Sequence, residues 1–173
     1  MSSFASLRDP APYHLLAYGT LLGSTIFQSF IGGVVAFRVL PRPQFASLQT
    51  KIFPVYFSLQ TVLPIALYLT APPSSPLTSS PVGGSTATAL IAAMGVAGLA
   101  NLVVVGPATT SVMKERKHQE TRDGKKSYDA GPHSAEMQAL NRKFAVMHGV
   151  SSAMNLVVLG AAVAYAFLIG ARF

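Results

Sequence analysis

Three long stretches of this chain contain no charged residue, and they constrain its fold more than any other feature. They run from Ala11 to Phe37, from Ile52 to Met113 and from Phe144 to Ala171. The hydrocarbon core of a bilayer is about 30 Å thick, and an α-helix needs roughly 20 apolar residues to cross it. The second stretch is long enough for two crossings, so the sequence predicts four membrane-spanning helices.

The composition leaves no room for a separate soluble domain. Of the 173 residues, 50% are hydrophobic and only 11% are charged, and the mean hydropathy is +0.43. A soluble domain carries about a quarter charged residues. We therefore expect an all-α, integral membrane four-helix bundle over residues 15–171, after an N-terminal tail of residues 1–14. The absence of cysteine excludes disulfides and cysteine-ligated metals.

The predicted spans cover about residues 15–37, 52–71, 86–110 and 144–169, with a hydrophilic loop at 111–143. The first run is too long for the apolar core of a signal peptide, so we interpret it as a retained span. Pro43 fits the first turn of a short interfacial helix before the second span. Residues 72–85 are rich in Pro, Ser, Thr and Gly and predict a flexible connection. Beyond the third span, residues 112–121 extend as a helix that Gly124 ends, and Ser134 caps the next helix.

The basic residues predict the orientation of the bundle. Of the 13 lysines and arginines, all except Arg8 and Arg172 lie in the connections that follow the first and third spans. The positive-inside rule places these connections in the cytosol and both termini on the non-cytosolic side. The pI near 10 reflects this topology rather than nucleic-acid binding, because the cations flank the spans without interleaved aromatic residues.

The basic residues beside the spans are also candidates for a contact surface. A juxtamembrane cation contributes about 1 kcal/mol of attraction to an anionic leaflet. We expect anionic lipid headgroups or a partner protein to bind here; the alternative is a solvated loop that only sets orientation. The candidate residues are Arg38, Arg42, Lys51, Arg142 and Lys143.

Each predicted span contains one side-chain amide, and these are Gln28, Gln60, Asn101 and Asn155. At a rise of 1.5 Å per residue all four lie roughly 12–17 Å from the cytosolic end of their spans. An amide facing lipid at that depth leaves its donors and acceptors unpaired, so we expect a single inward-facing polar layer. Two interpretations stay open: interhelical hydrogen bonds that fix helix rotation, or a layer that binds a solute.

A second polar group shares one face of the fourth span. His148, Ser151, Ser152 and Asn155 follow the spacing i, i+3, i+4, i+7. His148 either senses or passes a proton, or it bonds to a hydroxyl or a lipid phosphate. Small residues spaced by four, such as Gly19 and Gly23, suit packing within the chain or in a homo-oligomer.

The sequence offers little for catalysis. Acidic residues occur only in the predicted tail and loops, so no carboxylate pair lies inside the bundle. No two histidines share a helix face at metal-ligand spacing, and no hydrolase, phosphate-binding or metalloprotease motif is present. We therefore predict a protein that is not an enzyme and needs no cofactor or metal.

Two clusters of residues resemble the transmembrane protein 205-like family. The first begins with Phe37-Arg38-Val39-Leu40-Pro41-Arg42 and continues through Phe45, Gln49, Lys51, Phe53-Pro54 and Tyr56-Phe57. The second comprises Asn101, Pro107, Thr109-Thr110, Met113 to Glu115, Phe144, His148-Gly149, Ser151-Ser152 and Asn155-Leu156. The resemblance implies a four-span protein of eukaryotic membranes. Members are linked to vesicle trafficking, secretion and drug tolerance, without a settled biochemical activity.

These observations predict a membrane scaffold or accessory factor, acting for instance in trafficking, with basic cytosolic loops that contact anionic lipid or a partner. The alternative is a small-solute or proton-linked permeation unit that uses the amides and His148. A secretory-pathway membrane is the expected location, with a mitochondrial membrane as the alternative.

Overall fold

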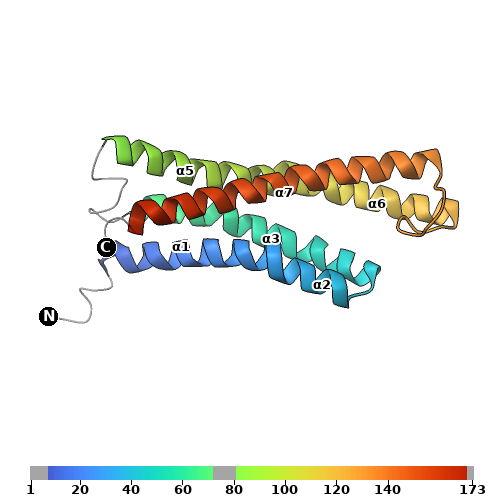
Figure 1. Ribbon diagram of the computed structural model, residues 1–173, viewed down its shortest axis with the longest axis horizontal. Coiled ribbons are helices and arrows are strands. Elements are labelled where there is room, and N and C mark those ends of the chain that lie inside the picture. The colour runs from blue at the N-terminus through green and yellow to red at the C-terminus, as the bar shows by residue number, and fades with distance from the viewer. Residues whose placement is uncertain (1–7, 72–80, 171–173) are drawn as a thin grey trace.

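The computed structural model describes residues 8–71 and 81–170, and this part of the chain is helical without any β-strand (Figure 1). The first helical rod joins α1 (Pro10–Ile26), the π-helical segment η2 (Phe27–Gly32) and α2 (Gly33–Val39). The second rod is α3 (Arg42–Leu69). The third joins α5 (Pro81–Ala100), the π-helical segment η3 (Asn101–Val105) and α6 (Gly106–Asp123), and α7 (Ala135–Gly170) is the fourth.

The rods form an antiparallel four-helix bundle. Contacts join α1 to α3, α3 to α5, α5 to α7 and α7 back to α1, so the ring of neighbours is closed. The start of α1 and the end of α7 lie at one end, called the terminal end below (Figure 1). The α2–α3 turn and the α6–α7 connection lie at the opposite end, called the basic end, where α6 and α7 project beyond α2 and α3 (Figure 1).

Four helices are long and apolar enough to cross a membrane, which confirms the predicted number of spans. They are Pro10–Val39, Arg42–Leu69, Gly84–Asp123 and Ala135–Gly170, with mean hydropathies between 1.5 and 2.2. At 1.5 Å per residue even the shortest is about 40 Å long, more than the hydrocarbon thickness. Large apolar side chains such as Leu16, Val62 and Phe167 point outward, as a lipid-facing surface requires.

The first helix begins earlier than predicted. Residues 10–14 were assigned to the tail, but α1 already starts at Pro10. The Asp9 carboxylate accepts a hydrogen bond from Ala11 N at 3.0 Å, which satisfies one of the free donors of the first turn. Proline is well suited to this position because its missing N–H has no partner there in any case. The helix therefore extends beyond the predicted span, whose start was set by hydropathy and not by the cap.

The second span also differs from the prediction. The structure has one helix from Arg42 to Leu69 in place of a short interfacial helix followed by a separate span. Pro54 and Pro64 lie inside it without ending it. Each costs one main-chain hydrogen bond; the helix continues because its apolar side chains pack against α1 and α5.

The extension of the third span into a hydrophilic helix is confirmed. α6 ends at Asp123, and Gly124 adopts the left-handed conformation with φ of 63° that suits glycine. Ser134 Oγ accepts from Met137 N at 3.1 Å, as the predicted cap requires. Because this cap starts α7 at Ala135, the fourth helix begins well before the apolar run at Phe144. Residues 72–80 of the predicted flexible connection lie outside the described part of the chain, but residues 81–85 are helical because α5 already begins at Pro81, so the prediction is wrong there.

The apolar core occupies the terminal half of the bundle. It is built around Leu21, Leu67, Met94, Val158 and Tyr165, all fully buried. Toward the basic end the buried positions include polar side chains such as Gln49, Gln60 and Asn101. The candidate amides therefore lie where the apolar core gives way to polar packing.

Candidate functional site

The amides of the first pair of rods (α1–η2–α2 with α3) do not bond to those of the second pair (α5–η3–α6 with α7). Gln28 Nε2 donates to Gln49 Oε1 at 3.3 Å, which links η2 to α3. Gln60 Nε2 donates to the Tyr56 hydroxyl at 2.8 Å and lies 3.5 Å from Thr25 Oγ1. Gln60 is fully buried, whereas Gln28 is half-buried at the side of the bundle.

The second helix pair has its own amide contact. Asn101 Nδ2 donates to Asn155 Oδ1 at 3.4 Å and to the main-chain oxygen of Ser151 at 3.3 Å. Asn101 is fully buried at the start of η3. Because π-helical turns often mark functional positions, the placement of Asn101 in one is notable.

The predicted single layer therefore takes the form of separate hydrogen-bonded groups. All four amides do turn toward neighbouring helices. The partner of Gln28 is Gln49, however, which lies outside the predicted second span. Tyr56 and Thr25 were also missed, since hydroxyl groups are common in membrane helices and carry no distinguishing spacing. The signal for Gln49 was the absence of any helix breaker between Gln44 and Ile52.

The predicted polar face of the fourth span contributes few groups to the hydrogen-bonded amides. His148 is exposed, and its ring stacks on Phe144 with centroids 5.9 Å apart. Ser151 contributes only its main-chain oxygen to the amide group. Within residues 8–71 and 81–170, neither His148 nor Ser152 is hydrogen-bonded to an amide.

A buried polar cluster that the sequence did not reveal lies at the terminal end. His14 Nε2 is 2.9 Å from the Tyr165 hydroxyl, and its Nδ1 is 3.3 Å from Thr70 Oγ1. Thr70 Oγ1 donates its only proton to Ala66 O at 2.6 Å, so it accepts from Nδ1–H. In the neutral ring, Tyr165 then donates to Nε2. This cluster ties α1, α3 and α7 together.

The predicted contact cations all lie exposed toward the basic end. Arg42 places its guanidinium 3.7 Å from the centroid of the Phe37 ring, a cation–π contact that positions the charge. Lys143 Nζ is 3.8 Å from Glu115 Oε2, which fixes it beside α6. The remaining exposed cations of the predicted set are Arg38, Lys51 and Arg142.

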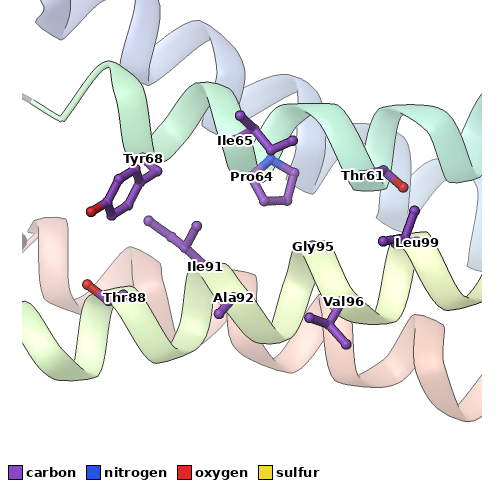
Figure 2. Close-up of a pocket in the computed structure, with 10 residues that line it drawn as sticks. All are labelled: Thr61, Pro64, Ile65, Tyr68, Thr88, Ile91, Ala92, Gly95, Val96 and Leu99. Carbon is purple, nitrogen blue, oxygen red and sulfur yellow. The ribbon is translucent and has the colours of Figure 1, made fainter.

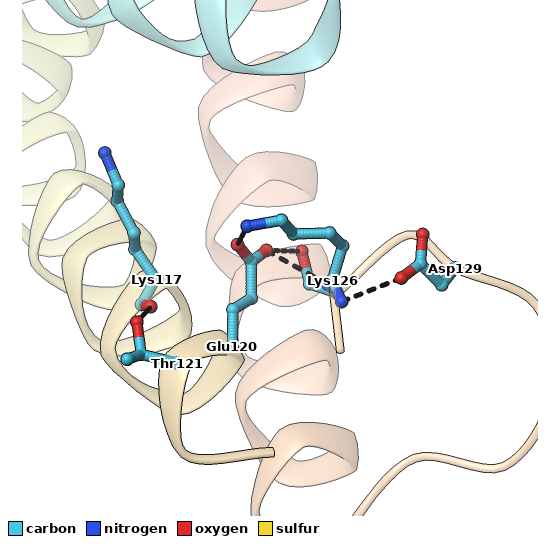
Figure 3. Close-up of polar contacts among 6 residues, drawn as sticks. Lys117, Glu120, Thr121, Lys126 and Asp129 are labelled. Carbon is cyan, nitrogen blue, oxygen red and sulfur yellow. Dashed lines mark hydrogen bonds and ion pairs between the residues drawn. The ribbon is translucent and has the colours of Figure 1, made fainter. Parts of the chain in front are cut away.

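The projecting α6–α7 connection is held by its own polar contacts. Glu120 Oε1 accepts from both the main-chain N and the hydroxyl of Ser127, at 3.0 and 2.6 Å. Lys126 Nζ lies 3.9 Å from the second Glu120 oxygen, and Lys126 N donates to Asp129 (Figure 3). The connection is therefore a defined structure.

A lateral groove runs along the outer face of the contact between α3 and α5 (Figure 2). It has a volume of about 350 Å³ and a largely apolar lining. Pro64 faces Gly95 across it, and Tyr68 and Thr88 lie at its terminal end (Figure 2). A second hollow, on the outer face of α7, is lined in part by Arg142, Lys143, Val146 and Met147. Neither hollow is lined by any of the four predicted amides.

Four apolar helices packed in a closed ring define this chain as a multi-pass integral membrane protein. It belongs to the family of the domain of unknown function DUF4149, whose profile matches residues 16–118, more than half of the chain. The chain is also similar to xanthocillin biosynthesis cluster protein D of Aspergillus fumigatus. The two are 32% identical over 156 residues, which cover 90% of this chain and 86% of that protein. No solved structure matches the chain.

Proposed function

We propose that this protein is a non-enzymatic membrane scaffold or accessory factor whose basic end binds anionic lipid headgroups. The observation that supports this most is the arrangement of the exposed cations. Arg38 and Arg42 flank the α2–α3 turn, whereas Arg142 and Lys143 project from α7, so both helix pairs present positive charge at the same end.

The neighbours of these cations support lipid binding rather than simple solvation. Arg42 is held over Phe37, so less side-chain entropy is lost when its guanidinium pairs with a phosphate. On α7, Arg142 and Lys143 share one hollow with Val146 and Met147. Charge followed by apolar surface along a helix matches the order of headgroup and acyl chain in a phospholipid.

The orientation and the membrane are part of the same proposal. The positive-inside rule places the basic end in the cytosol and both termini on the other side, most simply in a secretory-pathway membrane. In a mitochondrial membrane the basic end faces the cytosol or the matrix instead. The resemblance to the transmembrane protein 205-like family supports a role in trafficking or secretion.

The fungal relative adds a second line of support for an accessory role. Its name assigns it to the xanthocillin biosynthesis cluster. We extend this only to the proposal that the present chain also assists the production or movement of a small molecule. A partner enzyme or a second copy at the membrane is consistent with such a role.

A permeation unit is the second candidate, and one observation favours it. Two fully buried amides, Gln60 and Asn101, each keep an oxygen for which residues 8–71 and 81–170 supply no hydrogen-bond donor. Such acceptors suit a polar solute, but the two hollows lie elsewhere. Flux of small solutes into vesicles containing the protein, compared with the Gln60→Met variant, distinguishes this role from that of a scaffold.

Native mass spectrometry of the purified protein tests the lipid-binding proposal. The Arg38→Gln/Arg42→Gln variant should bind phosphatidylserine about 30-fold more weakly, because each cation contributes about 1 kcal/mol. Phosphatidylcholine binding should not change. The matched control is Lys117→Gln/Arg122→Gln, which removes the same charge from α6 nearer its projecting end. Equal losses in both variants would mean that net charge alone, and not the proposed surface, attracts the lipid.

A further inference from the structure

Two fully buried oxygens near the crossing of α3 and η3 have no donor in the described part of the protein. They are Gln60 Oε1 and Asn101 Oδ1, and both residues have zero exposure. An unpaired buried acceptor costs about 1–3 kcal/mol, so two at one crossing are a substantial departure from ordinary packing.

The hydrogen bonds of the two NH2 groups agree with both oxygens lying on the side where α3 faces η3. Gln60 directs its NH2 group to Tyr56 and to Thr25 of α1, so its oxygen points away from those partners. Asn101 directs its NH2 group to Ser151 and Asn155 of α7, so its oxygen points away from α7. The neighbour that remains for each is the other helix, since α3 contacts η3.

The helix directions bring the two amides to the same level. α3 and α5 run in opposite directions (Figure 1), and helical side chains lean toward the N-terminus of their own helix. Gln60 leans toward Tyr56, as their hydrogen bond shows. Asn101 leans back over the turn that contains Gly98. A Cβ atom at Gly98 would lie only 2.6 Å from the main-chain oxygen of Gln60, so this turn rests directly on Gln60.

Pro64 adds a third acceptor to the same crossing. It lies four residues after Gln60 and has no N–H, so the main-chain oxygen of Gln60 lacks its regular helical donor. Among the described residues, the polar atoms that lack a donor at this crossing are therefore oxygens of the amides and of the main chain. The apolar stretches that contain these residues have no Asp or Glu, and a bare charge is costly inside a membrane.

We propose that this crossing is a binding site for a small uncharged molecule that donates two hydrogen bonds, with water as the smallest such ligand. The ligand joins Gln60 Oε1 to Asn101 Oδ1 and so connects the two separate amide groups. Buried waters in proteins typically make about three hydrogen bonds to groups of this kind. This inference is independent of the lipid-binding proposal, because the crossing and the basic end share no residue.

Water-to-amide magnetisation transfer by NMR, on protein labelled with ¹⁵N in Gln and Asn side chains, tests the proposal with water as the probe. We expect cross-peaks from long-lived water to the NH2 groups of Gln60 and Asn101 in the intact protein. The Asn101→Leu variant should lose most of the Gln60 cross-peak, at least a several-fold reduction. Gln28→Leu is the matched control and should leave it unchanged, because Gln28 belongs to another group.

Two results would overturn the proposal. One is the absence of a water cross-peak at both amides in the unmodified protein, a measurement that does not depend on any variant folding. The other is close contact between the Gln60 NH2 protons and Asn101 without a water signal. That result would mean that the two amides bond to each other directly.

Discussion

Two buried polar clusters in this bundle differ in how completely their hydrogen-bonding groups are paired. At the terminal end, both ring nitrogens of His14 have a hydroxyl partner, and the Tyr18 hydroxyl donates to Ala162 O at 3.1 Å. At the α3–η3 crossing, Gln60 and Asn101 each keep an oxygen that is unpaired within the described part of the chain. We call the terminal cluster closed because both ring nitrogens of His14 have partners, and the crossing open because two of its oxygens do not have one among the described residues.

This difference in pairing indicates that one cluster stabilises the bundle and that the other can bind a ligand. A closed network of buried hydrogen bonds fixes the relative rotation of the helices it joins, and it leaves nothing for a ligand. An open cluster costs stability unless a ligand completes it. We therefore expect the terminal cluster to hold α1, α3 and α7 together and the crossing to be the interior position with capacity for binding.

The largest effect should come from a substitution that forces the open crossing apart. Gly98→Val places side-chain atoms where a Cβ alone would lie 2.6 Å from the Gln60 main chain. Since main-chain atoms cannot move aside, we expect a loss of about 3 kcal/mol in the free energy of unfolding. Denaturant unfolding in mixed micelles measures it.

Gly160→Ala is the control for this substitution, because nothing lies within 4 Å of a Cβ at that position. It should be neutral or raise stability by up to about 1 kcal/mol, as alanine favours helix over glycine. If Gly98→Val is tolerated equally well, α3 and α5 do not cross closely at Gly98, and the argument that Gln60 and Asn101 lie together is lost.

The closed cluster should respond next most strongly. Tyr165→Phe removes the donor to His14 Nε2 and leaves a buried acceptor unpaired, which should lower the free energy of unfolding by about 2 kcal/mol. His14→Phe leaves the Tyr165 hydroxyl unpaired and should cost a similar amount. The double variant removes both groups and should cost clearly less than the sum. Additive losses would show that the two side chains act separately and that the cluster is not closed through this bond.

Hydropathy predicted the number of membrane-spanning helices, and the helix caps explain where the helices extend beyond the apolar runs. Charge-free runs of the required length leave a chain few choices, so the number of spans followed from the sequence. The start of the first helix did not, because Asp9 extends α1 beyond the apolar run, whereas the start of α7 after Ser134 was predicted. Both residues are recognisable caps, and Ser134 was identified as one.

The sequence predicted which amides face the interior, but it did not predict their hydrogen-bond partners. That Gln60 and Asn101 face the interior follows from the cost of exposing an amide to lipid. Their partners depend on helix rotation, which Gly98 and Pro64 set through packing that no sequence period shows. His14 was not predicted to be buried because it lies near a helix end, where a histidine ordinarily contacts water or headgroups.

The smallest expected effect concerns the hydrogen-bonded pair of half-buried Gln28 and buried Gln49. Their hydrogen bond, at 3.3 Å, joins η2 to α3. Interhelical bonds in membranes average about 0.6 kcal/mol, so Gln28→Met should lower the free energy of unfolding by about that amount. Gln49→Met should match it, since each variant removes the same bond, and the double variant should cost little more. A loss above about 2 kcal/mol for Gln28→Met would place this residue with the closed cluster. It would also show that polar groups toward the basic end stabilise the bundle as strongly as the His14 cluster does. That result would contradict the proposed difference between the two clusters.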